Sequence, residues 1–464
     1  MSIDVPGPEA GRPRLAEESP RLVELRAGID GSVRAGVRSI NGHQVVSFTV
    51  GGDLRSMSQV DGMTISAACE LARAKGHPVV GFVQSTGADV REGISAAHGW
   101  GSAARAMIKC SGIVPTVLVA TGPLVSGPAL MLGIADATIM VDDSYAFVSG
   151  PAMVEQFTGL PIDHDDLGGP AIQATKNGVA TAVVADLDAA ADMVADILSY
   201  LPDSNSELAP FRPTGDPVDR ACPELREIVP ANASGSYDVR HVIEAVADDQ
   251  VITELRSQWA SNLITAFANI GGYAVGIVAN QPQVLAGTLD IAASQKGARF
   301  VTLCDAFNIP LITFVDTPGF QPGKDLEWRG MIRHGAQLAF AYARATVPRI
   351  SVTLRKSYGG AYIVMDSKTM GNDLAMAWPS AEIAVMGAKG AVEILHRRAS
   401  AEERVDIEAD YEKRLLNPYV AAERGSVDMV IDPADTRRQI AEALDLLATK
   451  RERLPRRRHD NSPL

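Results

Sequence analysis

Two loops of small residues are the part of this sequence that could do chemistry. RKSYGGAYIVM, residues 355–365, sets two glycines between a basic pair and an apolar run, and GPLVSGPA, residues 122–129, forms a similar loop. Each loop follows a predicted strand and precedes a predicted helix. Backbone N–H groups at the start of a helix attract negative charge, so such a loop suits an oxygen anion that develops during a reaction. Close packing of strand against helix would also explain the glycines.

An internal duplication relates the two loops. The matching segments are GHPVVGFVQSTGA (76–88) with NIPLITFVDTPGF (308–320), and IVPTVLVATGPLVSGPA (113–129) with TVPRISVTLRKSYGGAY (346–362). The separation from Pro115 to Ser126 equals that from Pro348 to Gly359. Two matches at nearly the same offset indicate a duplicated fold with one small-residue loop in each half.

Short apolar strands alternate with longer helical patterns along most of the chain, which predicts an α/β fold. Asn41-Gly42 predicts a hairpin turn between two strands, and Gly76 predicts the end of a helix over 63–76. A stretch rich in Pro, Ser and Asp marks a linker. The predicted divisions are a mobile arm at 1–24, a first domain at 25–210, a linker at 211–235, a second domain at 236–455 and a basic tail at 456–464.

Composition and charge narrow the function classes. The net charge of −13 over 464 residues disfavours a nucleic-acid-binding protein. One dense basic run, 450–459, is expected to be a solvated terminus, with a docking contact for an acidic partner as the alternative. No run of apolar residues is long enough to span a membrane, and no signal-peptide pattern is found. The four cysteines are isolated in the sequence, so we expect a reducing cytoplasm and neither disulfides nor a zinc site.

Other motifs that could carry chemistry are weak. The sequence has no G-x-S-x-G motif for a hydrolase nucleophile, and GFQPGKD (319–325) lacks the spacing of a phosphate-binding loop. The run HDD (164–166) could ligate a metal, but a solvated loop is the better interpretation because no second histidine cluster accompanies it. We therefore predict no metal site and no side-chain nucleophile.

The second half closely resembles a known family over residues 270–455. The segments that carry the resemblance are DTPGFQPGKDLEWRGMIRHGAQLAFAYARATVPRISVTLRKSYGGAYIVM, AWPSAEIAVMGAKGAVEIL and NPYVAAERGSVDMVIDPADTR. They are similar to the carboxyltransferase (β) subunits of biotin-dependent acyl-CoA carboxylases, in particular the acetyl- and propionyl-CoA carboxylase subunits of actinobacteria. The first half is similar more loosely, through STGADVREG, GPLVSGPA, FVSGP and LGGP.

This resemblance implies two crotonase-like domains of the ββα-spiral type, assembled as a hexamer that is a trimer of dimers. It implies that each active site lies between the N-terminal half of one chain and the C-terminal half of its partner. Biotin would arrive on a separate biotinylated α subunit, and a CoA thioester would be the substrate. Carboxybiotin would release CO₂, and the freed biotin nitrogen would remove the α-proton, so the protein would need few reactive side chains.

The resemblance also assigns roles to the two loops. Gly359, Gly360, Ala361 and Tyr362 would receive carboxybiotin, with the N–H groups of Gly360 and Ala361 stabilising the ureido oxygen. Ser126 and Gly127 would stabilise the enolate oxygen of the acyl-CoA.

Two departures from the family pattern bear on function. Ser126-Gly127-Pro128 stands where the family has Gly-Gly-Ala, and Pro128 has no N–H to donate. Ile363 stands where propionyl-type members carry Asp, which is similar to acetyl-type subunits and favours acetyl-CoA as substrate and malonyl-CoA as product.

Two alternatives remain open at this point. One is a decarboxylase of malonyl-type thioesters, or another crotonase-type enzyme, that uses the same oxyanion sites. The other is a degenerate paralogue that acts as a structural partner in a carboxylase complex, an alternative that the altered 126–128 loop favours.

Overall fold

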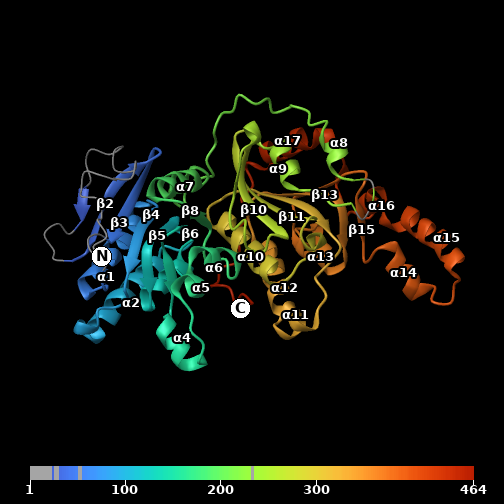
Figure 1. The fold of residues 1–464 in the computed structure, drawn as a ribbon. Coiled ribbons are helices and arrows are strands. Elements are labelled where there is room, and N and C mark those ends of the chain that lie inside the picture. Colours follow the sequence, from blue (N-terminus) through green and yellow to red (C-terminus); the bar gives the residue numbers. More distant parts are fainter. Residues whose placement is uncertain (1–22, 26–30, 51–54, 231, 233–234, 464) are drawn as a thin grey trace. The chain divides into compact units, whose positions relative to one another are not determined.

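The structure is a computed structural model that describes residues 23–25, 31–50, 55–230, 232 and 235–463. The chain forms two compact units, Met1–Leu208 and Ala209–Leu464, and each is described on its own (Figure 1). Most of the arm predicted at 1–24 lies outside the described residues. Its last two positions, Val23 and Glu24, belong to the first strand.

The first unit contains eight strands and seven α-helices among the described residues. They are β1 (Val23–Leu25), β2 (Val33–Ile40), β3 (His43–Val50), α1 (Gln59–Lys75), β4 (Val79–Ser85), α2 (Ile94–Ile108), β5 (Thr116–Val125), α3 (Leu130–Ile134), β6 (Ala137–Val141), β7 (Tyr145–Phe147), α4 (Pro151–Thr158), α5 (His164–Gly168), α6 (Pro170–Thr175), β8 (Ala182–Val184) and α7 (Leu187–Ser199).

The second unit contains eight strands and ten α-helices among its described residues. They are α8 (Leu225–Ile228), α9 (Arg240–Val246), β9 (Ile252–Glu254), β10 (Leu263–Ile270), β11 (Tyr273–Asn280), α10 (Ile291–Ala306), β12 (Leu311–Thr317), α11 (Lys324–Trp328), α12 (Met331–Arg344), β13 (Arg349–Tyr358), α13 (Gly359–Val364), β14 (Leu374–Ala377), β15 (Glu382–Ala384), α14 (Ala388–Leu395), α15 (Ala401–Tyr411), α16 (Pro418–Glu423), β16 (Met429–Val430) and α17 (Thr436–Leu447).

Sheet topology confirms the duplication. The first sheet runs β1-β2-β3-β4-β5-β6-β8 with β7 on β5, and the second runs β9-β10-β11-β12-β13-β14-β16 with β15 on β13. Each sheet begins with antiparallel pairs and continues with parallel ones. Even the irregularities match, because the register shifts at Val83/Ser85 in the first sheet and at Val315/Thr317 in the second.

Local signals read from the sequence are also confirmed. Ile40 pairs with His43 across the predicted turn, and both Asn41 (φ 49°) and Gly42 (φ 86°) are left-handed, as a type I′ turn requires. Helix α1 begins at a capping box of Ser58 with Asp61 and ends at Gly76, whose φ of 69° suits a residue without a Cβ.

Each sheet is covered by helices that bury apolar side chains. In the first unit, α1 and α2 contribute Ile65, Ala68 and Met107 to the core beneath the sheet. In the second unit, α9 and α17 cover one face with side chains such as Val242 and Leu444. On the other face of that sheet, Cys304 of α10 lies so close to Gly276 of β11 that an added Cβ would stand 2.4 Å from its sulfur. Small residues here let strand and helix approach closely.

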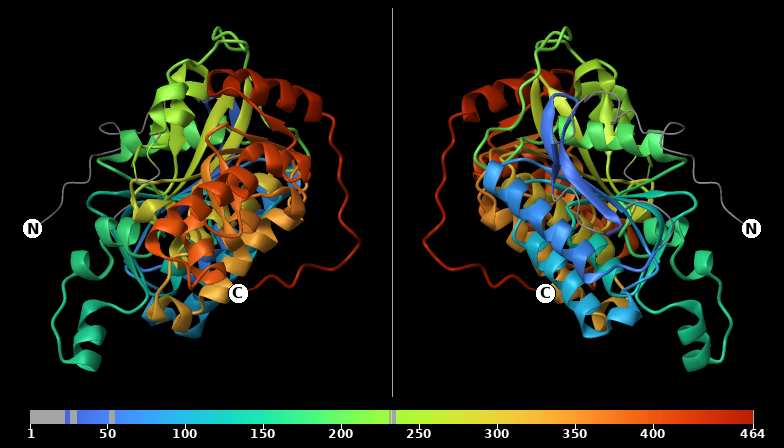
Figure 2. Two further views of the ribbon diagram at one scale, coloured as in Figure 1. Left: turned by 90° about the vertical axis from the view of Figure 1, so that its right-hand side faces the viewer. Right: turned by 90° about the vertical axis from the view of Figure 1, so that its left-hand side faces the viewer.

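The predicted linker at 211–235 and the predicted basic tail at 456–464 both belong to the second unit. Within the segment predicted as a linker, Cys222 and Leu225 are fully buried in the core of that unit. After α17, residues 450–463 run in extended form (Figure 2). Residues 451–459 are exposed, and Asp460 accepts from Arg344 Nη1 at 2.7 Å.

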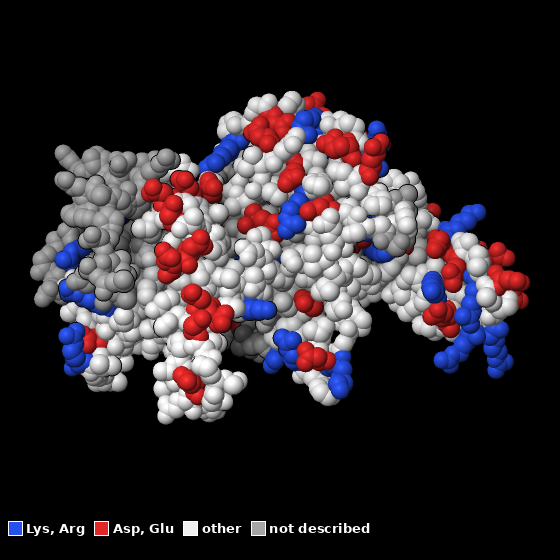
Figure 3. All heavy atoms as spheres, in the orientation of Figure 1, with Lys and Arg blue, Asp and Glu red and all other residues white. Residues whose placement is uncertain are grey.

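One face of the molecule is mixed in charge. On the face shown in Figure 3, Lys and Arg side chains are interspersed with Asp and Glu rather than gathered into one basic area. Among the described helices, none combines the length and the hydropathy that crossing a membrane requires.

Candidate functional site

The loop in the second unit is a tight junction between β13 and α13. Gly359 has a φ of 59°, a conformation that costs a residue with a side chain about 1 kcal/mol or more. The helix starts at Gly359, so the N–H groups of Gly360 and Ala361 lie in its first turn, before any intrahelical acceptor is available to them. Gly360 is exposed, while Ala361 is fully buried beneath it. The loop therefore presents backbone donors on a surface free of bulky side chains.

A second loop, which follows β12, lies against this one. A Cβ added to Gly360 would stand 3.3 Å from Cε2 of Phe320. Leu289 forms two backbone hydrogen bonds with this loop: its N–H donates to Gly319 O, and its carbonyl oxygen accepts from Gln321 N. The N–H of Phe320, which lies between Gly319 and Gln321 in the sequence, therefore points away from Leu289. Phe320 was not among the residues predicted from the sequence. The alignment of the duplicated halves, which places this loop at the end of a central strand, was the signal that could have found it.

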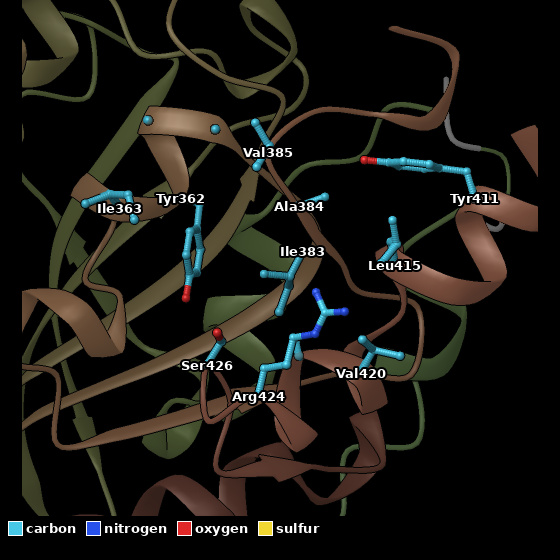
Figure 4. Close-up of a pocket in the computed structure, with 13 residues that line it drawn as sticks. Tyr362, Ile363, Ile383, Ala384, Val385, Tyr411, Leu415, Val420, Arg424 and Ser426 are labelled. Carbon is cyan, nitrogen blue, oxygen red and sulfur yellow. The ribbon is translucent and has the colours of Figure 1, made fainter. Parts of the chain in front are cut away.

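A cavity of about 600 Å³ opens beside the 359–361 loop (Figure 4). The residues that line it are Gly359, Gly360, Tyr362, Ile363, Ile383, Ala384, Val385, Tyr411, Leu415, Val420, Ala421, Arg424 and Ser426. Most of these side chains are apolar. The hydroxyl of Tyr362 is buried and has no hydrogen-bond partner within the described part of the chain. The predicted residues Gly359, Gly360, Tyr362 and Ile363 thus share one cavity wall, with Ala361 behind it.

A buried polar cluster fixes the two strands that carry these loops. The carboxylate of Asp316, near the end of β12, accepts from Arg355 Nε at 3.1 Å, from Tyr237 Oη at 2.8 Å and from the N–H of Lys356 at 3.1 Å. Arg355 also donates to Gly235 O at 2.8 Å. Burial raises the pKa of Asp316, and the charge of Arg355 opposes that rise. The cluster ties β12 to β13 immediately before both loops, and sequence reasoning did not find it.

The corresponding loop of the first unit differs in its backbone. Ser126 has φ 62° and ψ −145°, a region that is normally occupied by glycine. Its N–H, which was predicted to be an oxyanion donor, donates to Phe147 O at 2.9 Å. Pro128 has no N–H, so the N–H of Gly127 is the donor that the loop retains. A Cβ on Gly127 would stand 2.5 Å from the Trp100 ring, which explains why a glycine is required there.

Ser126→Gly is expected to stabilise the protein, because glycine adopts this conformation without the strain of about 1–3 kcal/mol that a side chain incurs. We expect the free energy of unfolding to rise by about 1 kcal/mol, measured by urea denaturation. Ser102→Gly is the matched control. Ser102 is exposed inside α2, so a glycine there should lower stability by about 0.5 kcal/mol. A loss of stability in both variants would contradict strain at Ser126.

The loop of the first unit also borders a cavity, of about 450 Å³, whose lining includes Thr86, Val125, Tyr145, Phe147 and His164. His164 was expected in a solvated loop. It is exposed and begins helix α5, and its ring lies 4.7 Å from that of Tyr145 and 5.8 Å from that of Phe147. In the described residues no group of three or more His, Cys, Asp or Glu side chains could hold a metal ion.

Asp89 has a structural role in the same unit. Its carboxylate accepts from the backbone N–H of Arg91 at 3.0 Å and caps a short 3₁₀ turn at Val90–Glu92. Hydrogen bonds from the Arg91 side chain and backbone lower the pKa of Asp89. The negative charge of Asp89 is therefore paired with Arg91, two residues along the chain.

Two mixed sheets of the same topology, each with a small-residue loop after a central strand, define a class of duplicated α/β protein. A family described as "Carboxyl transferase domain" matches residues 22–462. The chain belongs to this family, as the carboxyltransferase subunit of a biotin-dependent acyl-CoA carboxylase, with the crotonase-like fold expected from the sequence.

Several relatives are similar over most of the chain. The propionyl-CoA carboxylase beta chain of Saccharopolyspora erythraea is 44% identical over 436 residues, which cover 90% of this chain and 80% of the relative. The methylmalonyl-CoA carboxyltransferase 12S subunit of Propionibacterium freudenreichii is 43% identical and has the same coverages. A crystal structure of transcarboxylase 12S, described as a hexamer with hydrolysed methylmalonyl-coenzyme A bound, superposes with a TM-score of 0.94. It is 39% identical and covers 97% of this chain and 92% of its own.

Proposed function

We propose that this chain transfers a carboxyl group from carboxybiotin, carried on a separate biotinylated subunit, to a short acyl-CoA, with acetyl-CoA favoured and malonyl-CoA as the product. The observation that carries the proposal is the start of α13, where Gly360 and Ile363 line a cavity and Ala361 lies directly behind its wall. An apolar cavity of about 600 Å³ with a few polar groups suits a bicyclic ring system on an alkyl chain.

The chain's own part in this reaction is binding and charge stabilisation. Carboxybiotin, when bound, supplies both the CO₂ and the nitrogen that takes the α-proton of the thioester. Gly360 and Ala361 hold the ureido oxygen through their N–H groups, and Gly127 holds the thioester oxygen as its negative charge grows. Gly359 permits the turn that exposes these donors. No side-chain base is needed, in agreement with the absence of a catalytic motif in the sequence.

The test of the proposal is carboxylation by the chain combined with a biotinylated α subunit, ATP and bicarbonate. We expect acetyl-CoA, and with lower kcat/KM propionyl-CoA, to incorporate labelled bicarbonate. A hexamer in sedimentation would accord with the assembly described for the 12S relative. Failure to carboxylate any short acyl-CoA with a competent partner would contradict the proposal.

Ile363 bears on the choice of acyl group, because the relatives described above are named for propionyl-CoA and methylmalonyl-CoA. Ile363→Asp is expected to raise the ratio of kcat/KM for propionyl-CoA to that for acetyl-CoA by about tenfold, the scale of one methylene in a substrate pocket. The measurement is initial rates with both substrates. Ile363→Leu, which keeps the size and polarity, should leave the ratio within about twofold. An unchanged ratio in the Asp variant would remove Ile363 from acyl selection.

One observation favours a second candidate, a paralogue that acts as a structural partner. The N–H of Ser126 is engaged with Phe147 O, which reduces the number of donors available to a thioester. Calorimetry with acetyl-CoA separates the two candidates, since a purely structural subunit need not bind CoA. Incubating malonyl-CoA with the chain alone tests for a decarboxylase, because a carboxyltransferase should require biotin before malonyl-CoA is consumed.

A further inference from the structure

Arg424 is the cation of the cavity beside the 359–361 loop. It lies at the end of α16, and Figure 4 shows its guanidinium pointing inward between Ile383 and Leu415. Within the described part of the chain, the cavity lining contains no carboxylate, and the Arg424 side chain forms no hydrogen bond or ion pair. By contrast, the exposed Arg414 forms an ion pair with Asp410 at 2.7 Å. Arg424 therefore has its donors available on the cavity side.

Two hydroxyl groups lie on the same side of the cavity. The buried hydroxyl of Tyr362 lacks a partner, and the Ser426 side chain, two residues after Arg424, also faces the cavity (Figure 4). A buried hydroxyl without a partner is destabilising, so a ligand group that forms a hydrogen bond with it would recover that loss. The residues around the guanidinium are apolar, with Ile383, Leu415 and Val420 beside it (Figure 4). The arrangement suits a ligand with an apolar body and one anionic group.

We propose that Arg424 binds a carboxylate of the ligand that occupies this cavity, with Tyr362 and Ser426 as neighbouring hydroxyl donors. Arginine presents paired N–H groups whose geometry matches the two oxygens of a carboxylate. This inference rests on the proposed function, in which two ligands carry such a group beside the 359–361 loop. They are biotin carboxylated on its ureido nitrogen and the carboxylated acyl-CoA. Arg424 is a binding residue here and takes no part in proton transfer.

Binding measurements with matched probes test the role of Arg424 without relying on turnover. Biotin methyl ester is compared with its derivative that carries a carboxymethyl group on the ureido nitrogen, a stable anion. In parallel, acetyl-CoA is compared with malonyl-CoA. For the wild-type protein we expect the anionic member of one pair to bind about tenfold more tightly than the neutral member. A tenfold difference in binding lies at the low end of the effect of a hydrogen bond to a charged group. We expect the low end because Arg424 is exposed to solvent.

Arg424→Gln should abolish that preference, and Arg424→Lys, which keeps the charge, should restore part of it. Arg398→Gln is the control, since Arg398 is also an exposed arginine of the second unit but does not line the cavity. Loss of the preference within the biotin pair identifies carboxybiotin as the source of the carboxylate, and loss within the CoA pair identifies the acyl product. Equal preferences in Arg424→Gln and Arg398→Gln would overturn the inference while leaving the proposed function in place. If the wild-type protein binds neither biotin probe nor CoA, the proposed function fails and the inference fails with it.

Discussion

Gly360→Val should reduce carboxyl transfer by at least about 100-fold while leaving the fold intact. The Cβ of the new side chain would stand 3.3 Å from the Phe320 ring, and its methyl groups would extend into the cavity over the N–H groups of the α13 start. Loss of one backbone donor to a developing oxyanion typically costs 100- to 1,000-fold in rate. The valine side chain would also block the approach of biotin to the loop, so turnover with the biotinylated subunit should fall to background.

Stability should respond weakly to the same change. Gly360 is exposed, and its φ is not positive, so valine fits the backbone without the strain expected at Gly359. Thermal melting should therefore shift by only a few degrees. Gly390→Val is the control, because Gly390 also lies in a helix of the second unit and a Cβ there would make an ordinary 3.7 Å contact with Met386. Near-normal turnover in Gly360→Val, or equal loss in the control, would contradict the role assigned to the loop.

The sequence alone was sufficient for the features that depend on local pattern. Asn41-Gly42 predicted its hairpin because few residue pairs tolerate two left-handed conformations. The repeated strand-and-loop segments predicted two sheets of the same topology, because the duplicated pattern extends over whole strands. The small-residue stretch at 359–361 was located at a strand–helix junction for the same reason.

Features that depend on distant parts of the chain could not be predicted. The acceptor of the Ser126 N–H is Phe147 O, and this contact follows from the pairing of β5 with β7 at the end of the sheet. His164 was read as part of a polar run, but the neighbouring rings of Tyr145 and Phe147 come from a strand earlier in the chain. Arg424 could not be singled out from the sequence, because only the folded cavity shows that no carboxylate of the described residues lines it beside the guanidinium.

Arg355→Met should lower the free energy of unfolding of the second unit by about 3–5 kcal/mol. The side chains of Arg355 and Asp316 are only 7% and 2% exposed, so removing the guanidinium leaves a buried carboxylate without its cationic partner. The hydrogen bond from Arg355 to Gly235 O is lost as well. Urea denaturation followed by tryptophan fluorescence is a suitable measurement, because Trp378 is buried in the core of this unit.

We attribute the expected loss of stability to the buried charge that Arg355→Met leaves unpaired, and not to the removal of an arginine as such. Arg414→Met makes the same substitution in an ion pair whose side chains are 62% and 59% exposed, and it should cost less than about 1 kcal/mol. Asp316→Asn keeps an acceptor for Tyr237 while removing the charge. The double variant Arg355→Met/Asp316→Asn should therefore lose less free energy of unfolding than the two single variants lose together, by at least about 1 kcal/mol. Additive losses would show that Asp316 and Arg355 act independently. A coupled loss would identify the pair as the connection that holds β12 and β13 in register just before the loops that line the site.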